Sequence, residues 1–177
     1  MIGIAICSIG FSQTNFVWEK TDSVKKTKAQ IYSETKMFIA KTWKSSKDVI
    51  QNDDKEGGLI LIKGVVGSNI ESYMFAKYQY TYQYNITFRI KENRFKITLD
   101  NVICISAKCI TGNGQIWEKP KIEPFDDDNC PDINAFSGDG LPCKKMIPLM
   151  ANVKERIQAI FDLCVSEISK PSNNSNW

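Results

Sequence analysis

The chain has 177 residues, of which 42% are hydrophobic and 24% are charged, a composition typical of a folded globular protein of one domain. Because the sequence contains no histidine, it excludes Ser-His-Asp and Cys-His catalytic sites and every metal site with an imidazole ligand. The net charge is only +3, and Arg89, Arg94 and Arg156 stand among scattered lysines, so the composition argues against a sequence-specific nucleic-acid binder.

The first twelve residues, MIGIAICSIGFS, carry no charge, and polar residues begin at Gln13. This pattern is typical of a secretory signal peptide with small residues, Gly10 and Ser12, before the cleavage site, although the basic segment that usually precedes the apolar region is missing. A short buried strand is the alternative. We expect residues 1–12 to be a signal peptide and the protein to be secreted or periplasmic. So short an apolar stretch cannot cross a bilayer of about 30 Å as a helix, so we expect no integral membrane segment in the mature chain.

Residues 16–18 predict a short strand, after which Asp22 or Ser23 can cap a helix that reaches about Trp43. Six residues at helical spacing predict the buried face of this helix: Ile31, Thr35, Phe38, Ile39, Thr42 and Trp43. Residues 48–51 and 58–66 then predict two strands, which the turn-rich residues 52–57 join into a hairpin.

The most regular pattern runs from residue 78 to residue 109 and predicts a long hairpin. A two-residue turn at Glu92 and Asn93 produces five apolar pairs: Ile90/Phe95, Phe88/Ile97, Ile86/Leu99, Tyr82/Ile103 and Tyr80/Ile105. The alternate pairs, Arg89/Lys96, Thr87/Thr98, Asn85/Asp100 and Gln83/Val102, predict a polar opposite face, and a slip of one residue would destroy both patterns. The tyrosines at 80, 82 and 84 fit either a stacking platform for a ligand or the core, and their shared face with Ile86 and Phe88 favours the core.

Periodicity disappears between residues 110 and 147, which predicts an irregular excursion. Aspartates at 126, 128, 132 and 139 resemble calcium ligands, but the EF-hand spacing is not met. We expect an acidic, solvated loop with no metal site, and nothing in the sequence indicates a cofactor.

Pro148 is predicted to begin the last helix, and its apolar stripe consists of Val153, Ile157, Ile160, Phe161, Cys164 and Ile168. The tail at 171–177 is polar and is expected to fray.

Five cysteines follow the predicted signal peptide, an odd number without any Cys-x-x-Cys pair. In an exported chain they favour disulfides. Cys130 and Cys143 flank a stretch rich in proline and glycine, and a bond between them would stabilise the fold by about 3 kcal/mol. Cys109 has the parity of the inward residues and Cys164 lies on the helix stripe, so we expect a second bond there. In a protein that is not exported, these residues would be small buried hydrophobic side chains.

The order of elements predicts an α+β fold, with a curved antiparallel β-sheet and two helices packed on one face, in a single domain at residues 13–170. Several segments carry a resemblance to a known family: QIY at 30–32 continuing to Trp43, IQNDD at 50–54, GGLILIKG at 57–64, YNITFRI at 84–90 and NRFK at 93–96. Over residues 16–107 and the last helix, the chain resembles the exported bacterial domain of unknown function with a TBP-like fold. The resemblance implies this fold and an envelope setting, with no established activity and no catalytic residues.

These features favour a non-enzymatic secreted or cell-envelope binding module for an unknown envelope protein, peptide or glycan. Since both helices must cover the apolar sheet face, the binding residues are expected on the opposite face: Asn85, Thr87, Arg89, Lys96, Thr98 and Asp100. A merely solvated face is the alternative, because antiparallel sheets commonly expose one side to water. A carboxylate-type hydrolase acting on envelope glycans or peptides would need two acids in one cleft. Nucleic-acid binding rests only on analogy with the TBP fold, so we expect no nucleic-acid partner.

Overall fold

The computed structural model describes residues 17–43, 46–73, 75–124 and 143–171. The strands are β1 (Trp18–Ser23), β2 (Ile50–Asp54), β3 (Leu59–Gly67), β4 (Glu71–Tyr73), β5 (Ala76–Lys91), β6 (Arg94–Thr111) and β7 (Ile116–Pro124). The helices are α1 (Lys28–Thr42), α2 (Ser46–Val49) and α3 (Cys143–Ser169). Within these residues, no helix is long and apolar enough to span a membrane.

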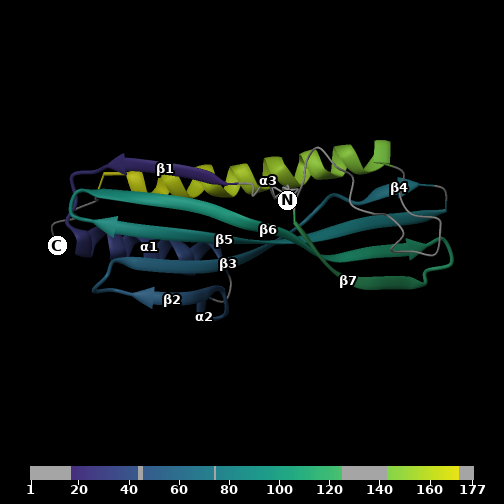
Figure 1. Cartoon of the computed structure of the whole chain (residues 1–177), viewed down its shortest axis with the longest axis horizontal. Helices are drawn as coiled ribbons and strands as arrows, with labels where there is room; N and C mark the ends of the chain where they lie inside the picture. Colours follow the sequence, from purple (N-terminus) through teal and green to yellow (C-terminus); the bar gives the residue numbers. More distant parts are fainter. Residues whose placement is uncertain (1–16, 44–45, 74, 125–142, 172–177) are drawn as a thin grey trace, which may run out of the picture.

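The seven strands form one sheet in which every pair is antiparallel. Along the order β1-β6-β5-β3-β2, the long β5–β6 hairpin lies at the centre. Its turn end is flanked by β1 and β3, and its other end by β7 and β4. Figure 1 shows an elongated, twisted sheet, with α1 behind the turn end and α3 along most of its length. The predicted curved antiparallel sheet with two helices on one face is confirmed.

One face of the sheet and the two long helices enclose the core. Side chains along β5 alternate between buried and more accessible from Tyr78 to Ile90. The buried helix residues that meet this face include Ile31, Thr35, Phe38 and Ile39 of α1 and Val153, Ile157, Phe161, Cys164 and Ile168 of α3. The predicted helix stripes are therefore largely confirmed, although Thr42 is exposed and Trp43 and Ile160 are only partly buried.

The first strand is longer than predicted, and the first helix starts later. Asp22 and Ser23 are not helix caps, because they lie in β1 opposite Phe95 and Arg94. The N-cap is Thr27, whose side-chain oxygen accepts a hydrogen bond from the Gln30 N–H at 3.2 Å, while the Gln30 side chain accepts one from the Thr27 N–H at 2.8 Å. This reciprocal capping box satisfies two backbone donors that a helix otherwise leaves unpaired.

The next predicted hairpin is present with a shifted first strand. Asp48 and Val49 belong to the short helix α2, and β2 begins at Ile50. β2 pairs with β3 across a turn at residues 55–58, so the predicted strand at 48–51 was placed about two residues too early.

The long hairpin confirms the predicted turn and the pairs from Ile90/Phe95 to Asn85/Asp100, but two β-bulges change the register beyond them. The first bulge lies near Asn101, whose φ is 51°, in the left-handed region that asparagine tolerates. The second leaves Ile105 without a partner between Tyr82/Cys104 and Thr81/Ser106.

As a result of these bulges, the predicted pairs Tyr82/Ile103, Tyr80/Ile105 and Gln83/Val102 were wrong. Ile103 lies opposite Gln83 and Tyr80 lies opposite Ala107. Val102, which was predicted on the polar face, is 5% exposed and belongs to the core. Because each bulge reverses parity once, the two together restore it, so Cys109 faces the core as predicted.

The predicted excursion at 110–147 is partly regular structure. β6 continues to Thr111, and β7 pairs with it across a short turn. The last helix begins at Cys143, so Pro148 lies inside α3 instead of opening it. The acidic stretch that starts at Asp126, including Cys130, falls outside the described residues. The predicted signal peptide at 1–12 and most of the tail at 171–177 also fall outside them.

The structure does not contain the predicted Cys109–Cys164 bond. Cys104, Cys109 and Cys164 are buried thiols that form no disulfide bond within the described residues, and burial raises the pKa of the Cys164 thiol to about 12. These three residues therefore pack as small hydrophobic side chains, which was the alternative interpretation. The predicted Cys130–Cys143 bond lies outside the described residues.

A buried lysine joins the two long helices. The side chain of Lys26 is 2% exposed and forms an ion pair with Glu34 of α1 at 2.5 Å. The same ammonium donates a hydrogen bond to the backbone carbonyl of Ile168 at 3.0 Å. It thus satisfies a carbonyl in the last turn of α3, where intrahelical donors are absent.

Gly64 makes room for a core tyrosine. It lies directly opposite Tyr84 in the β3–β5 pairing, and a Cβ atom at this position would lie 2.2 Å from Cζ of the Tyr84 ring. Tyr84 is 1% exposed, so its ring has little space into which to move. The missing side chain of Gly64 is therefore a packing requirement.

We expect Gly64→Ala to lower the free energy of unfolding by about 1–3 kcal/mol, because an added methyl group must displace a packed ring. Denaturant unfolding measures this loss. Gly67→Ala in the same strand is the matched control, since its Cβ would approach the flexible Gln79 side chain at 3.3 Å and the Tyr80 carbonyl oxygen at 4.0 Å. Equal stability of the two variants would contradict the proposed packing role of Gly64.

Burial of tyrosines also predicts a pH dependence. Burial raises the pKa of Tyr84 to about 12 and raises that of Tyr80 as well, whereas an unfolded tyrosine ionises near pH 10. Since the folded state holds these protons more tightly, stability should be constant below about pH 10 and fall as the pH rises toward 12. Denaturant unfolding at several alkaline pH values measures this, and the decline should be smaller in Tyr84→Phe.

Candidate functional site on the open sheet face

The candidate site is the sheet face opposite α1 and α3, called the open face below. Strand alternation places every second side chain of β1, β6, β5 and β3 on it. Two rows cross the four strands: Thr21, Lys96, Arg89 and Leu59 form one, and Glu19, Thr98, Thr87 and Leu61 form the next. Neither of the two long helices in the described part of the chain packs on this face.

The structure brings together all six residues that were predicted as a binding surface. Asn85 lies opposite Asp100, Thr87 opposite Thr98, and Arg89 opposite Lys96. Arg89 is exposed and the other five are partly buried. Because these pairs precede the first bulge, their side chains share one face and have the predicted neighbours.

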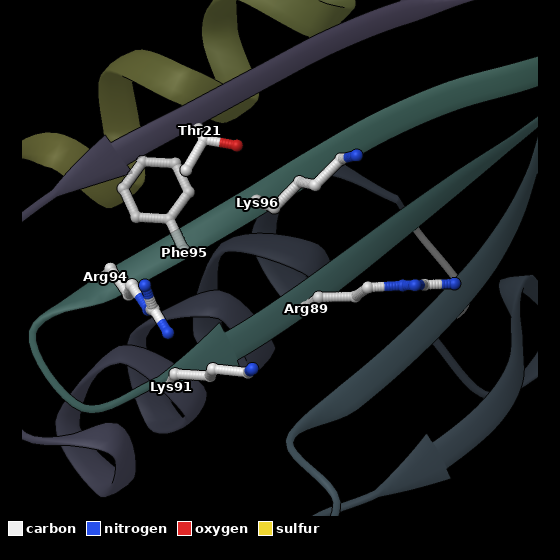
Figure 2. A pocket seen from close by; sticks show the side chains of 6 residues that line it. All are labelled: Thr21, Arg89, Lys91, Arg94, Phe95 and Lys96. Atoms are coloured by element: carbon white, nitrogen blue, oxygen red, sulfur yellow. The ribbon is translucent and has the colours of Figure 1, made fainter.

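The turn end of the open face carries a cluster of cations, called the basic patch below: Arg89, Lys91, Arg94 and Lys96. Together with Thr21 and Phe95 they line a shallow hollow of about 280 Å³. Figure 2 shows the four cationic side chains extending from β5 and β6 on the same side of the sheet. Four neighbouring positive charges produce a local potential that attracts anions.

Glu19 of β1 is the carboxylate that enters this cluster. It accepts a hydrogen bond from Lys96 Nζ at 2.8 Å, as an ion pair, and one from Thr98 Oγ1 at 3.1 Å. These two hydrogen bonds lower the pKa of Glu19 below its usual value. Among the described residues, no ion pair joins a carboxylate to Arg89, Lys91 or Arg94, so the patch keeps an excess of positive charge.

Asp100 has the opposite electrostatic environment. Partial burial raises its pKa, the neighbouring Arg89 opposes this, and the Glu19 charge adds to the rise. The open face therefore carries two carboxyl groups whose pKa values are shifted in opposite directions.

Sequence reasoning missed two kinds of site residue. Glu19 and Thr21 reach the open face through pairing of β1 with β6, a contact between distant segments that local periodicity does not reveal. Lys91 and Arg94 were recognisable, because they directly flank the predicted turn and have the parity of Arg89 and Lys96. Three aliphatic residues of β3, Leu59, Leu61 and Val65, also lie on this face, with Lys63 between the last two, and they were not predicted as part of it.

One other candidate site does not form, and the calcium candidate with Asp126, Asp128, Asp132 and Asp139 lies outside the described residues. Tyr80, Tyr82 and Tyr84 are at most 4% exposed, so they form core and not a stacking platform. Within the described part of the chain, no three cysteine, aspartate or glutamate side chains lie close enough together to hold a metal ion.

Comparison with known proteins supports the fold. A TBP-like protein from Parabacteroides distasonis ATCC 8503 has a crystal structure that is similar with a TM-score of 0.58 and 11% sequence identity, covering 89% of this chain and 95% of the other. A DUF4468 family protein from Bacteroides ovatus ATCC 8483 is similar with a TM-score of 0.54 and 14% identity, covering 90% of each chain. At these identities the likeness concerns the fold alone.

Comparison of the sequence gives the family. No curated protein matches the sequence. The model of a family described as a domain of unknown function, DUF4468, with TBP-like fold matches residues 19–103. The matched region runs from β1 through the β5–β6 hairpin up to the second bulge, and it includes the whole basic patch. Residues 19–103 of this chain are therefore similar to the DUF4468 family, a domain of unknown function with a TBP-like fold.

Proposed function

We propose that the protein is a non-enzymatic binding module that acts in the cell envelope or outside the cell, and that its ligand binds the open face. The observation that carries the proposal is the basic patch, where three of four neighbouring cations have no ion pair with a described carboxylate. The apolar sequence at residues 1–12 supports export.

The open face suits recognition because its side chains are held by paired strands. Residues on rigid elements keep their geometry, so less conformational entropy is lost on binding than at a flexible loop. The hollow beside the patch is shallow, and its lining consists of cations, Thr21 and Phe95. It contains no nucleophile with a neighbouring general base, which a covalent or acid-base mechanism would need.

Charge reversal at the patch tests the proposal. We expect Arg89→Glu combined with Lys96→Glu to remain folded, because Arg89 is exposed and Lys96 is partly exposed. Binding to components of a cell-envelope extract should fall at least about tenfold, since attraction becomes repulsion. Affinity capture with quantification of each retained component measures the change.

The matched control is Lys77→Glu combined with Lys108→Glu, which changes the net charge equally at the other end of the hairpin. This control should retain the wild-type ligands. If the patch variant is folded by circular dichroism and captures the same components as the wild type in equal amounts, the basic patch is not the binding site.

The two carboxyl groups favour a second candidate function, a hydrolase acting on envelope glycans or peptides. Glycosidases pair an ionised carboxylate with a carboxylic acid of raised pKa. The pKa of Glu19 is lowered and that of Asp100 is raised. However, Glu19 is already paired with Lys96 and Thr98, so the binding module remains our first proposal.

An activity assay decides between these candidates. For a hydrolase, purified protein should release reducing ends from glycans or new amino termini from peptides. Asp100→Asn should then lower kcat at least about 100-fold, the usual contribution of general acid-base catalysis. Asp162→Asn on the exposed side of α3 is the control. Absence of release by the wild-type protein would eliminate the hydrolase.

A further inference from the structure

We propose that the ligand of the open face is an acidic polysaccharide, whose carboxylate or sulfate groups bind the basic patch. The inference rests on the proposed binding function and specifies the class of ligand. The hydroxyl groups of such a polymer would lie over Asn85, Thr87 and Thr98, which are next to the patch on the same face.

The arrangement of charge on the basic patch favours a polymeric anion. Arg89 with Lys96 and Lys91 with Arg94 form two cross-strand pairs that follow each other along the hairpin. Positions two residues apart on a strand are separated by about 7 Å. The patch therefore presents a two-by-two array of cations, which suits a polymer with repeated anionic groups better than a single small anion.

A carboxylate, that of Glu19, already binds at the edge of the basic patch. Glu19 occupies a site between an ammonium, Lys96 Nζ, and a hydroxyl, Thr98 Oγ1. Both groups donate to the same oxygen, Oε1 of Glu19, so a cation with a neighbouring hydroxyl donor forms a site for one oxygen of a carboxylate or sulfate group. Glu19 therefore shows which chemical group the face accepts, and it competes with the ligand for Lys96.

Nucleic acids and extended acidic peptides fit the basic patch less well. Single-stranded nucleic acids are held largely by stacking of their bases on aromatic side chains. The aromatic residues of β5 and β6 near the patch, Tyr84, Phe88 and Phe95, are at most 2% exposed and belong to the core. Extended peptides usually pair with the backbone of a sheet edge, but the patch lies on the two central strands, whose backbones are already paired with each other and with β1 and β3.

A row of polar side chains lies beyond the cations on the same face. Thr87, Thr98 and Asn85 supply hydroxyl and amide groups that can both donate and accept hydrogen bonds. Saccharide hydroxyls need partners of this kind. Together, the cations and this row match a ligand that combines negative charges with many hydroxyl groups.

Titration with defined polymers tests the inference. The probes are polygalacturonate, which carries carboxylates, dextran sulfate, neutral dextran, poly-L-glutamate and single-stranded DNA. Calorimetry at low salt should show binding to polygalacturonate, to dextran sulfate or to both, with no binding to neutral dextran. The two acidic polymers distinguish carboxylate from sulfate as the preferred group. Binding should weaken as salt is raised, because the contacts are exposed ion pairs.

Two variants should change the affinity in opposite directions. Arg89→Gln combined with Arg94→Gln should weaken binding at least about tenfold, because two exposed cations are lost. Glu19→Gln should strengthen it about threefold by removing a competing carboxylate, a modest change typical of exposed charge pairs. Lys77→Gln combined with Lys108→Gln is the control for net charge and should leave the affinity within about twofold. Lys91→Gln combined with Lys96→Gln replaces the first variant if that one does not fold.

Several results would overturn the inference. Binding of poly-L-glutamate or DNA as tight as that of the acidic glycans would mean that charge alone, or another polymer class, is recognised. Equal affinity of the wild type and the patch variants would place the glycan elsewhere on the molecule. If no probe binds while Arg89→Glu with Lys96→Glu still abolishes capture of an envelope component, the ligand class is wrong but the proposed binding function stands.

Discussion

The antiparallel pairing of β5 with β6 is the constraint on which the rest of the structure depends. β1 and β7 pair with β6, and β3 and β4 pair with β5, so each of these strands takes its register from the hairpin. The same alternation separates the side chains into two sets. One set forms the core with α1 and α3, and the other forms the open face with its basic patch. The open face and the core are therefore consequences of a single register.

The sequence was sufficient to predict this hairpin only where its pattern alternates. From Asn85 to Asp100 across the turn, apolar and polar residues alternate strictly, and the predicted pairs are correct. Residues 102–105, Val-Ile-Cys-Ile, are all apolar, so no alternation marks the side that faces the core, and the two bulges could not be located. β7 was missed because Pro120 and Pro124 and the glycines at 112 and 114 are typical of irregular structure. Glu19 was not predicted on the open face either, because it reaches that face through pairing of β1 with the distant strand β6.

The basic patch lies beside a turn that is fixed to the start of α1. The backbone N–H of Val24 donates to the carbonyl of Asn93 at 2.9 Å, and the N–H of Asn93 donates to the carbonyl of Lys26 at 3.1 Å. Glu92 accepts a hydrogen bond from the N–H of Lys28 at 2.9 Å, at the helix terminus where a negative charge is favourable. Lys26 in turn holds the end of α3. The end of the hairpin that carries the cations is thus anchored on its inner side, which restricts its motion without covering its outer side.

The two bulges give β6 a tolerance to changes of length that a regular strand lacks. Each bulge contains one residue without a partner on β5. Loss of Asn101 would restore regular pairing at that point and leave every later side chain on its present face. Loss of a residue from a regular stretch, such as Ile97, would instead invert the side chains up to the next point where the register can adjust. Related hairpins can therefore differ by one or two residues in the second strand and still present the same core and the same open face.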